Sequence, residues 1–329
     1  MKQQTLAMAA DAQLGFEQHR KPTRRDEFLK TMDSLVPWAA LCEEIAPHYP
    51  KAGNGRPPIG LQRMLRIHFI QHWFNLADLA CEEALYDSAS LRRFVGIDLG
   101  LEPVPDATTM LRFRRLLNAN KLGEALFARV GKELQARGIK VNTGTIVDAT
   151  IIAAPSSTKN TDKARDPEMH QTRKGNQWYF GMKAHIGTDA GTGYVHSVTA
   201  TAANVSDITE AVHLMRPDDT AGWGDAGYLG VDKREEITGD PHLAGVTWHI
   251  AARKSQLARM HPHERAIESR KAGVRAKVEH AFLIVKRDFG FTKTRYRGLA
   301  KNLHRLHVAF ALANWLMRAR AVALTTAAA

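Results

Sequence analysis

The pattern of hydrophobic and polar positions divides the chain into two parts. Over residues 59–137, apolar side chains recur at intervals of three and four, which predicts amphipathic helices with one face toward a core. From residue 144 onward, short β-branched runs alternate with helical stretches, a pattern typical of α/β proteins. The sequence therefore predicts a helical region over residues 26–140 and an α/β domain over residues 141–316.

The two ends of the chain show neither period. Residues 1–25 are polar and are predicted to form a flexible arm, and residues 317–329 a C-terminal tail. No apolar stretch approaches the roughly 20 residues of a membrane span, and the first residues lack the apolar core of a signal peptide. Cys42 and Cys81 are far apart in sequence and in no metal-ligand spacing, as expected for reduced thiols. We expect a soluble, cytoplasmic protein.

The second part begins with a β-branched strand that carries Asp148. A polar segment over residues 156–177 follows and is predicted to be a mobile loop near the active site. A disordered segment that becomes ordered when DNA binds is an equal alternative. A hairpin is expected next, with strands at residues 178–186 and 194–201, followed by a helix at 207–215 and a strand just before Asp225. A helix at 231–237, a strand at 246–251 and a last helix around Glu279 complete the expected order.

Asp148 interrupts the apolar run Thr145-Ile-Val-Asp-Ala-Thr-Ile-Ile152. This run reads as a buried central strand, where an unpaired carboxylate would cost several kcal/mol. Either a cation neutralises Asp148, or it caps a turn at the end of the strand. The segment alone favours neither interpretation.

Two further carboxylates stand in similar contexts. Asp225 precedes Gly227 at the end of a predicted strand, where a parallel sheet presents ligands, although Asp-Ala-Gly is also an ordinary turn sequence. Glu279 lies beside an apolar stripe at helical spacing, on the same face as Arg275 and Lys286. A solvated Arg275–Glu279 pair would also explain that spacing. Carboxylate oxygens are the ligands that Mg²⁺ and Mn²⁺ prefer.

Basic residues gather around the third carboxylate. Residues 251–305 contain 15 Lys and Arg against four acidic residues, a net of +11 out of +12 for the whole chain. A basic region around an acidic cluster suits a polyanionic substrate, because the cations bind phosphates while the carboxylates hold metal ions.

The helical part contains a second group of basic residues. Asp106 is a predicted N-cap before a helix that carries Arg112, Arg114 and Arg115. This helix either enters a DNA groove or is a solvated surface helix.

Several segments resemble the DDE transposases of bacterial insertion sequences, in the branch named after insertion sequence five. The likeness covers roughly residues 20–316. It rests on Arg275-x-x-x-Glu279-x-x-x-x-x-x-Lys286 after Val147-Asp148-Ala149-Thr150 and Asp225-Ala-Gly-Tyr228, and on Tyr49-Pro-Lys-Ala-Gly-Asn-Gly-Arg56, Asp166-Pro-Glu-Met-His170, Lys174-Gly-Asn-Gln-Trp178, Gly181-Met-Lys-Ala-His-Ile-Gly187, Phe289-Gly-Phe291 and Arg295-Tyr-Arg-Gly-Leu299. One departure is Ala272, where the broader family pattern has a tyrosine.

The resemblance implies a ribonuclease-H-like mixed sheet with flanking helices, preceded by an all-α region that binds element ends. It implies that Asp148, Asp225 and Glu279 are catalytic and hold two Mg²⁺ or Mn²⁺ ions. It also implies that Arg275 and Lys286 grip DNA, and it places Lys183 and His185 at the active-site rim. The partners implied are the element's terminal inverted repeats and target DNA, bound by a homodimer near the bacterial nucleoid.

The function expected is transposition, in which phosphodiester hydrolysis is followed by joining of the 3′-hydroxyl to target DNA. A nuclease of the same fold is one alternative, and a non-catalytic DNA-binding protein derived from a transposase is another. Trp73, Trp223 and Trp315 are expected in the core, and a base-stacking role stays open for Trp178.

Overall fold

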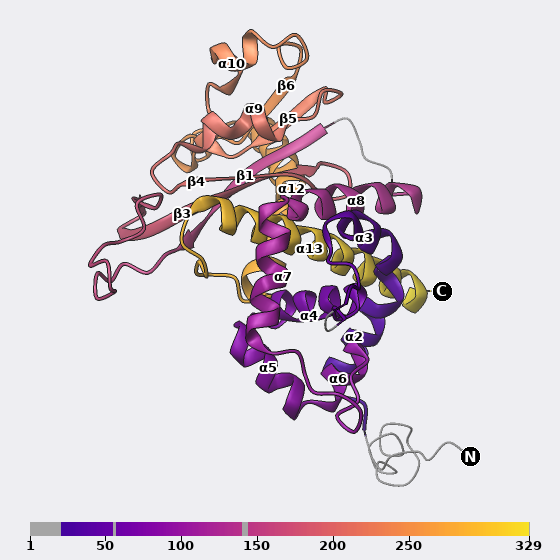
Figure 1. The fold of residues 1–329 in the computed structure, drawn as a ribbon. Helices are drawn as coiled ribbons and strands as arrows, with labels where there is room; N and C mark the ends of the chain where they lie inside the picture. The colour runs from indigo at the N-terminus through magenta and orange to yellow at the C-terminus, as the bar shows by residue number, and fades with distance from the viewer. Residues whose placement is uncertain (1–20, 55–56, 140–143, 329) are drawn as a thin grey trace. The chain divides into compact units, whose positions relative to one another are not determined.

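The computed structural model describes residues 21–54, 57–139 and 144–328, which form two units (Figure 1). One unit is helical and comprises Met1–Arg129 with Trp315–Ala329, and the other is an α/β unit over Val130–Asn314. The predicted arm over residues 1–25 lies largely outside the described residues. No helix in the described ranges is long and apolar enough to cross a membrane.

The helical unit contains the amphipathic helices that the sequence predicts. They are α2 (Arg24–Leu35), α3 (Trp38–Ile45), the short η1 (Ala46–His48), α4 (Leu61–Trp73), α5 (Asp78–Asp87), α6 (Ala89–Val95), α7 (Ala107–Ala119) and the beginning of α8 (Leu122–Ala136). Its core includes an aromatic cluster of Trp38, Phe69, Trp73 and Phe94, whose neighbouring ring centroids lie 5.5–5.8 Å apart.

The predicted start of α7 is confirmed. The Asp106 carboxylate accepts a hydrogen bond of 2.6 Å from the backbone N–H of Thr109, as an N-cap does. On the same helix the Arg114 guanidinium forms an ion pair with Asp78 of α5, with a second hydrogen bond of 2.7 Å. Arg114 therefore ties two helices of the unit together.

The α/β unit is built on a six-stranded mixed sheet in the order β2-β3-β1-β5-β6, with β4 also paired to β3. Its strands are β1 (Gly144–Ala153), β2 (His170–Lys174), β3 (Gln177–Asp189), β4 (Val195–Ala202), β5 (Ala221–Gly224) and β6 (Thr247–Ile250). Strand β3 runs antiparallel to β1, and β5 runs parallel to it. The sheet has the ribonuclease-H-like topology implied by the resemblance, and Figure 1 shows β1, β3 and β4 side by side.

Helices and turns connect these strands. They are η2 (Asp207–Glu210), α9 (Ala211–Leu214), η3 (Ala226–Tyr228), η4 (Val231–Lys233), α10 (Glu235–Thr238), α11 (Lys254–Leu257), α12 (Pro262–Leu283), the π-helical turn η5 (Ile284–Asp288) and α13 (Leu299–Ala328). The helices predicted at 207–215 and 231–237 are each split into two short pieces. Residues 317–328, predicted as a tail, continue α13.

The two faces of β1 have different surroundings because side chains alternate along a strand. Val147 points into a buried cluster with Leu214, Tyr228 and Val231 on one face. Asp148 points to the other face, toward α12, where Arg275 reaches it. Four residues of the stripe predicted along α12 and the turn after it are buried, namely Val278, Ala281, Val285 and Phe289, and the fifth, Val274, is half-buried.

One strand was not predicted from the sequence. Residues His170–Lys174 form β2, which pairs antiparallel with β3, inside the segment predicted as a loop. Its burial pattern is exposed on both faces, so it lacks the apolar alternation by which a half-buried strand is recognised. The loop prediction was therefore wrong for this part of residues 156–177.

Candidate active site

Asp148 and Asp225 meet at the point where the sheet changes from parallel to antiparallel. Strand β5 pairs with β1 only along Gly144–Ile146, so Asp148 lies just beyond the end of this pairing. Asp225 directly follows β5 and caps the η3 turn by accepting a 2.8 Å hydrogen bond from the Gly227 N–H. Both carboxylates thus reach the edge of the sheet where open α/β sheets bind ligands.

Helix α12 and its π-helical end bring the third carboxylate and the cations to the same place. A pocket of about 670 Å³ is lined by residues from β1, β2, β3, η2, the end of β5 and α12, namely Asp148, Ala149, Thr150, Ile151, Thr172, Arg173, Lys174, Lys183, Asp207, Asp225, Arg275, Glu279, His280, Phe282, Leu283, Lys286 and Arg287. The three predicted catalytic carboxylates, both predicted phosphate-gripping cations and Lys183 therefore share one cavity.

Burial dominates the electrostatics of Asp148. Desolvation raises the pKa of its carboxyl to about 7. A 2.7 Å hydrogen bond from the Ala149 N–H and the charge of Arg275 oppose this rise, while the neighbouring Asp225 and Glu279 carboxylates add to it. A carboxylate held beside two others in a poorly solvated place is one that a cation would stabilise.

The donor set of the pocket fits divalent metal ions. Oxygen donors are the ligands that Mg²⁺ and Mn²⁺ select. Within the described ranges, no three His, Cys, Asp or Glu side chains converge as a ready-made metal cage.

The two predicted cations make different contacts. Lys286 donates hydrogen bonds of 3.0 Å to the Ile151 carbonyl and the Thr150 hydroxyl on the edge of β1. Partial burial, and secondarily the charge of Lys174, lower the pKa of its ammonium group. Arg275 lies 3.9 Å from the Asp148 carboxylate. The alternative Arg275–Glu279 ion pair is absent from the part of the chain that the structure describes.

Lys183 and His185 differ from the expectation of a DNA-facing rim. The Lys183 ammonium donates to the Val205 carbonyl at 2.7 Å and lies 2.8 Å from an Asp207 oxygen, so its charge is neutralised at the wall of the pocket. His185 is fully buried, and its Nε2 lies 2.8 Å from the Thr201 hydroxyl. Burial lowers the pKa of the His185 imidazole to about 4. A neutral, buried ring cannot contact DNA in this arrangement, which corrects the expectation for His185.

The arginines of α7 belong to the helical unit. Arg112 and Arg115 are exposed, whereas Arg114 is mostly covered in its ion pair with Asp78. Of the three residues, only Arg112 and Arg115 present an accessible charge. The tryptophans Trp73 and Trp315 are buried as expected, Trp223 is half-buried against His249, and Trp178 is exposed.

Several pocket residues were not singled out as site residues from the sequence, among them three charged residues outside α12 and its π-helical end. Arg173 and Lys174 lie on the unpredicted strand β2, and Asp207 starts η2. The available signal was the cluster of Lys and Arg in the polar segment 156–177, which was predicted to lie near the active site as a loop and not as a strand. Nothing in the local sequence distinguishes Asp207 from an ordinary helix-starting aspartate.

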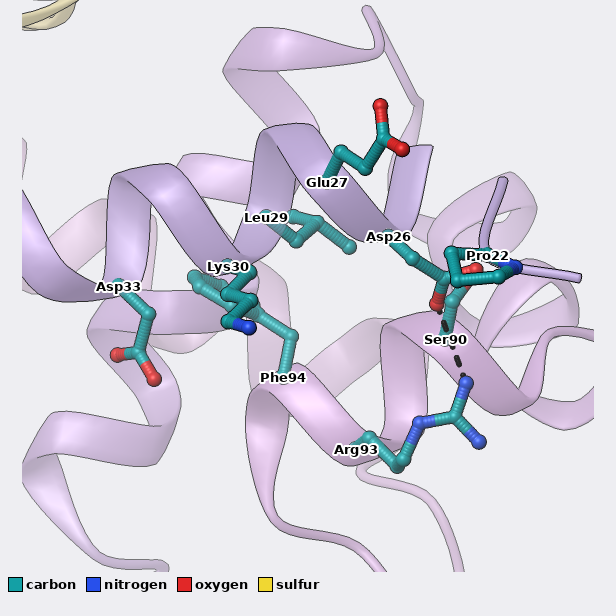
Figure 2. Close-up of a pocket in the computed structure, with 9 residues that line it drawn as sticks. All are labelled: Pro22, Asp26, Glu27, Leu29, Lys30, Asp33, Ser90, Arg93 and Phe94. Atoms are coloured by element: carbon teal, nitrogen blue, oxygen red, sulfur yellow. Dashed lines mark hydrogen bonds and ion pairs between the residues drawn. The ribbon is translucent and has the colours of Figure 1, made fainter. Parts of the chain in front are cut away.

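A second pocket, in the helical unit, suits this chemistry less well. It has a volume of about 550 Å³, and Figure 2 shows Asp26, Glu27 and Asp33 around it. Asp26 is held by Arg93 at 3.1 Å, and Asp33 accepts a hydrogen bond of 3.0 Å from the Trp38 ring. An acidic lining with internally satisfied carboxylates does not favour a polyanionic substrate.

Two protein families match parts of the chain. Residues 140–315 match the family described as "Transposase DDE domain", and residues 16–116 match the family described as "Transposase domain (DUF772)". A cryo-EM structure of the piggyBac transposase synaptic complex with hairpin DNA has a TM-score of 0.44 and 11% sequence identity, over 90% of this chain and 74% of that one. Because the DDE-domain match spans more than half of the chain, the protein belongs to the transposase DDE domain family and is a DDE-type DNA transposase.

Proposed function

We propose that the protein cleaves the ends of an insertion sequence and joins the freed 3′-hydroxyl groups to target DNA. The observation that carries this proposal is the meeting of Asp148, Asp225 and Glu279 with Arg275 and Lys286 in one pocket, from segments far apart in sequence. Two further parts of the proposal, a homodimer in the DNA complex and membership of the insertion sequence five branch, rest on the sequence resemblance.

In this proposal the three carboxylates hold two Mg²⁺ or Mn²⁺ ions. Such ions would activate the attacking group and stabilise the leaving oxygen of a phosphodiester. Asp148 would be shared by the two ions, a role supported by the effect of both Asp225, at the end of β5, and Glu279, on α12, on the pKa of its carboxyl. The raised pKa of Asp148 falls back when a cation occupies the site, because opposite charge favours the ionised form.

Arg275 and Lys286 would orient the scissile phosphate. Lys286 is fixed to the edge of β1 by its bonds to Thr150 and Ile151, and the charge of Glu279 reaches its ammonium. Arg275 approaches Asp148 from α12 at 3.9 Å, a distance that lets it turn to a phosphate when DNA arrives. A held phosphate gains reactivity from correct alignment, so these residues act by positioning.

We further propose that residues 26–140 recognise the element ends. Exposed Arg112 and Arg115 on α7 are its candidate DNA contacts. In this proposal the helical region recognises the element ends, and the α/β domain of residues 141–316 catalyses cleavage and joining.

The test is an in vitro assay of cleavage and joining on DNA that carries the inverted repeats flanking the gene. Asp148→Asn, Asp225→Asn and Glu279→Gln each remove one metal-binding charge with little change in volume, so each should abolish both reactions and leave end binding intact. Asp232→Asn is the matched control, because Asp232 is an exposed carboxylate of the same unit outside the pocket.

The same assay separates the alternatives. A nuclease of this fold would cleave the ends without joining them, and a non-catalytic DNA-binding protein would do neither with any divalent ion. Strand joining that persists in one of the three carboxylate variants would remove that residue from the proposed mechanism.

A further inference from the structure

Strands β2 and β3 form a tight hairpin beside the pocket. Lys174 pairs with Gln177, so only Gly175 and Asn176 make the turn. Gly175 has a φ of +61°, which a two-residue hairpin turn of the II′ type requires at its first position. Arg173 secures the turn by donating to the Gly175 carbonyl at 3.1 Å and to the Asn176 side chain at 3.3 Å. The tip is therefore a defined structure.

Trp178 stands on this hairpin with 65% of its surface exposed. Within the described residues, no ring or cation packs onto its indole, whereas the nearby Phe180 ring is covered by the Arg165 guanidinium at 5.3 Å. An exposed, uncovered tryptophan ring contributes nothing to the core of the unit. Its flat faces remain available to a partner.

The register relates this ring to the active site. Trp178 is directly opposite Arg173, so the two side chains lie on the same face of the hairpin. Arg173 and the next residue, Lys174, line the pocket that contains Asp148. The charge of Lys174 also reaches Lys286 and contributes to its lowered pKa. Two cations thus stand at the wall of the catalytic cavity, and the aromatic ring lies beside one of them, Arg173, on the same face of the hairpin.

We propose that this hairpin binds an unpaired nucleotide of the DNA end, with the base stacked on Trp178 and the flanking phosphates on Arg173 and Lys174. This inference takes one point from the proposed function, namely that the end of a DNA duplex enters the pocket. Single-stranded nucleic acid is bound by this combination of a stacking ring and adjacent cations, because every base has a flat face and every nucleotide a phosphate. Bases inside a duplex have both faces covered, so the ring selects a frayed or cleaved end.

The test compares two DNA probes with the full-length protein. One is a 20-base-pair duplex with blunt ends, and the other is the same duplex with a three-nucleotide single-stranded extension. Binding is measured with the Asp148→Asn protein, so that no cleavage occurs. The extended duplex should bind about tenfold more tightly, and Trp178→Ala should remove that advantage while leaving blunt-duplex affinity unchanged, a loss of ~1.4 kcal/mol.

Two further variants sharpen the result. Trp178→Phe keeps a smaller ring and should retain most of the preference, whereas Arg173→Ala removes a phosphate contact and should weaken both probes. A 2-aminopurine base in the extension should show stacking on the indole in wild-type protein that is lost in Trp178→Ala. Thermal melting should be the same for Trp178→Ala and wild type, since the ring is exposed.

Equal weakening of both probes by Trp178→Ala, or no effect of Trp178→Ala on either probe, overturns the proposal. So does a change of oligomeric state in Trp178→Ala with normal probe discrimination, which would assign the ring to a protein contact. Because these measurements need no catalysis, a protein that binds the extended end but never joins DNA would contradict the proposed function and leave this inference standing.

Discussion

At the scale of single residues, Asp148 shows how burial sets up the chemistry. Its side chain retains only 14% of its exposure, which accounts for the rise of its pKa to about 7. A carboxylate with a raised pKa costs stability when it ionises, and the cost disappears when a cation binds. In the metal-free protein, ionised Asp148 therefore lowers the free energy of unfolding, and Asp148 is also a proposed ligand of the metal ions.

The first prediction concerns Asp148 and pH. The folded protein binds a proton at Asp148 up to a pKa of about 7, and an unfolded aspartate only up to 3.8. Stability thus falls as pH rises from about 4 to 7, and the loss is complete above the folded pKa. Without divalent ions, Asp148→Asn should be more stable than wild type at pH 8 by ~2–4 kcal/mol. The difference should vanish near pH 4.

Denaturant unfolding of both proteins in EDTA, from pH 4 to 8, measures this difference. Titration of other groups, such as His185, is common to both proteins and cancels. Added Mg²⁺ at pH 8 should stabilise wild type more than the variant. A variant that is less stable than wild type at pH 8 would show that Asp148 is held by contacts other than those described.

Lys286 supports a second prediction at this scale. From the sequence, its replacement by Ala is expected to change stability by under about 1 kcal/mol. The bonds to Ile151 and Thr150 raise that expectation to about 1–2 kcal/mol for Lys286→Ala, because the variant leaves polar groups of β1 without their partner. Joining should fall far more, by at least a hundredfold, through loss of phosphate alignment.

Three comparisons isolate the role of the ammonium group. Lys286→Arg should restore joining only in part, because a planar fork does not reproduce a compact charge. Thr150→Val should lose stability but keep most activity, and Arg287→Ala, at the exposed neighbouring position, should melt as wild type does. If Lys286→Ala joins pre-cleaved ends normally, the positioning role is wrong.

At the scale of secondary-structure elements, the hydrophobic pattern determined what could be predicted. The strands around Asp148 and Asp225 and the stripe on α12 carry apolar residues at clear periods, and they were found. Strand β2 has none, because it pairs at the edge of the sheet with both faces exposed. Its existence depends on the partner strand β3, which a local pattern cannot show.

A local pattern also cannot show which side chains of distant segments make contact. The sequence placed Arg275 and Glu279 one helical turn apart and left their pairing open. The structure instead turns Arg275 toward Asp148, a contact between segments more than 120 residues apart. The π-helical turn at Ile284–Asp288, which sets the direction of Lys286, likewise has no signature in the sequence.

A third prediction concerns the start of α13. Two carboxylates from the loop before β2 cap this helix: Asp166 accepts from the Gly298 N–H and Glu168 from the Leu299 N–H, each at 2.7 Å. Gly298 has a φ of +91°, and a Cβ there would lie 3.1 Å from the Glu168 carboxylate. These contacts give a physical reason for two of the motifs that carry the family resemblance.

Asp166→Ala or Glu168→Ala should each lower the free energy of unfolding by about 1–2 kcal/mol, as loss of a helix cap does. Asp162→Ala is the matched control, since its ion pair with Arg297 is exposed and should contribute under about 1 kcal/mol. Urea unfolding checks all three. Equal effects in the three variants would mean that the loop is held by general packing and not by the caps.

At the scale of the whole molecule, net charge alone overstates the DNA-binding surface. Residues 251–305 carry a net charge of +11, yet several of these cations are used inside the fold. Lys277 donates to the carbonyls of Ala190 and Gly191, and Lys271 pairs with Glu268 at 2.7 Å. The sequence could predict that the region is basic, but the allocation of each cation to a phosphate or to a carbonyl required the structure.

The last prediction uses this allocation. Three cations that line the catalytic pocket form no ion pair with an acidic side chain in the described residues, namely Arg173, Lys174 and Lys286. Arg275 lies 3.9 Å from Asp148, and Arg287 lies 2.9 Å from Asp288. Each phosphate contact contributes about −0.9 to the slope of log affinity against log salt concentration. Lys174→Ala should therefore reduce the magnitude of the slope by about one unit, because a single phosphate contact is lost. Lys277→Ala should leave the slope unchanged, since its ammonium is already bound to backbone carbonyls.

The measurement is the affinity of Asp148→Asn protein, with and without each lysine substitution, for one DNA duplex between 50 and 300 mM salt. The two lysines make a stringent pair, because they carry the same charge and change the net charge of the chain equally. If both substitutions change the slope alike, binding depends on net charge and not on position. A change for Lys174 alone would place DNA at the pocket wall formed by β2.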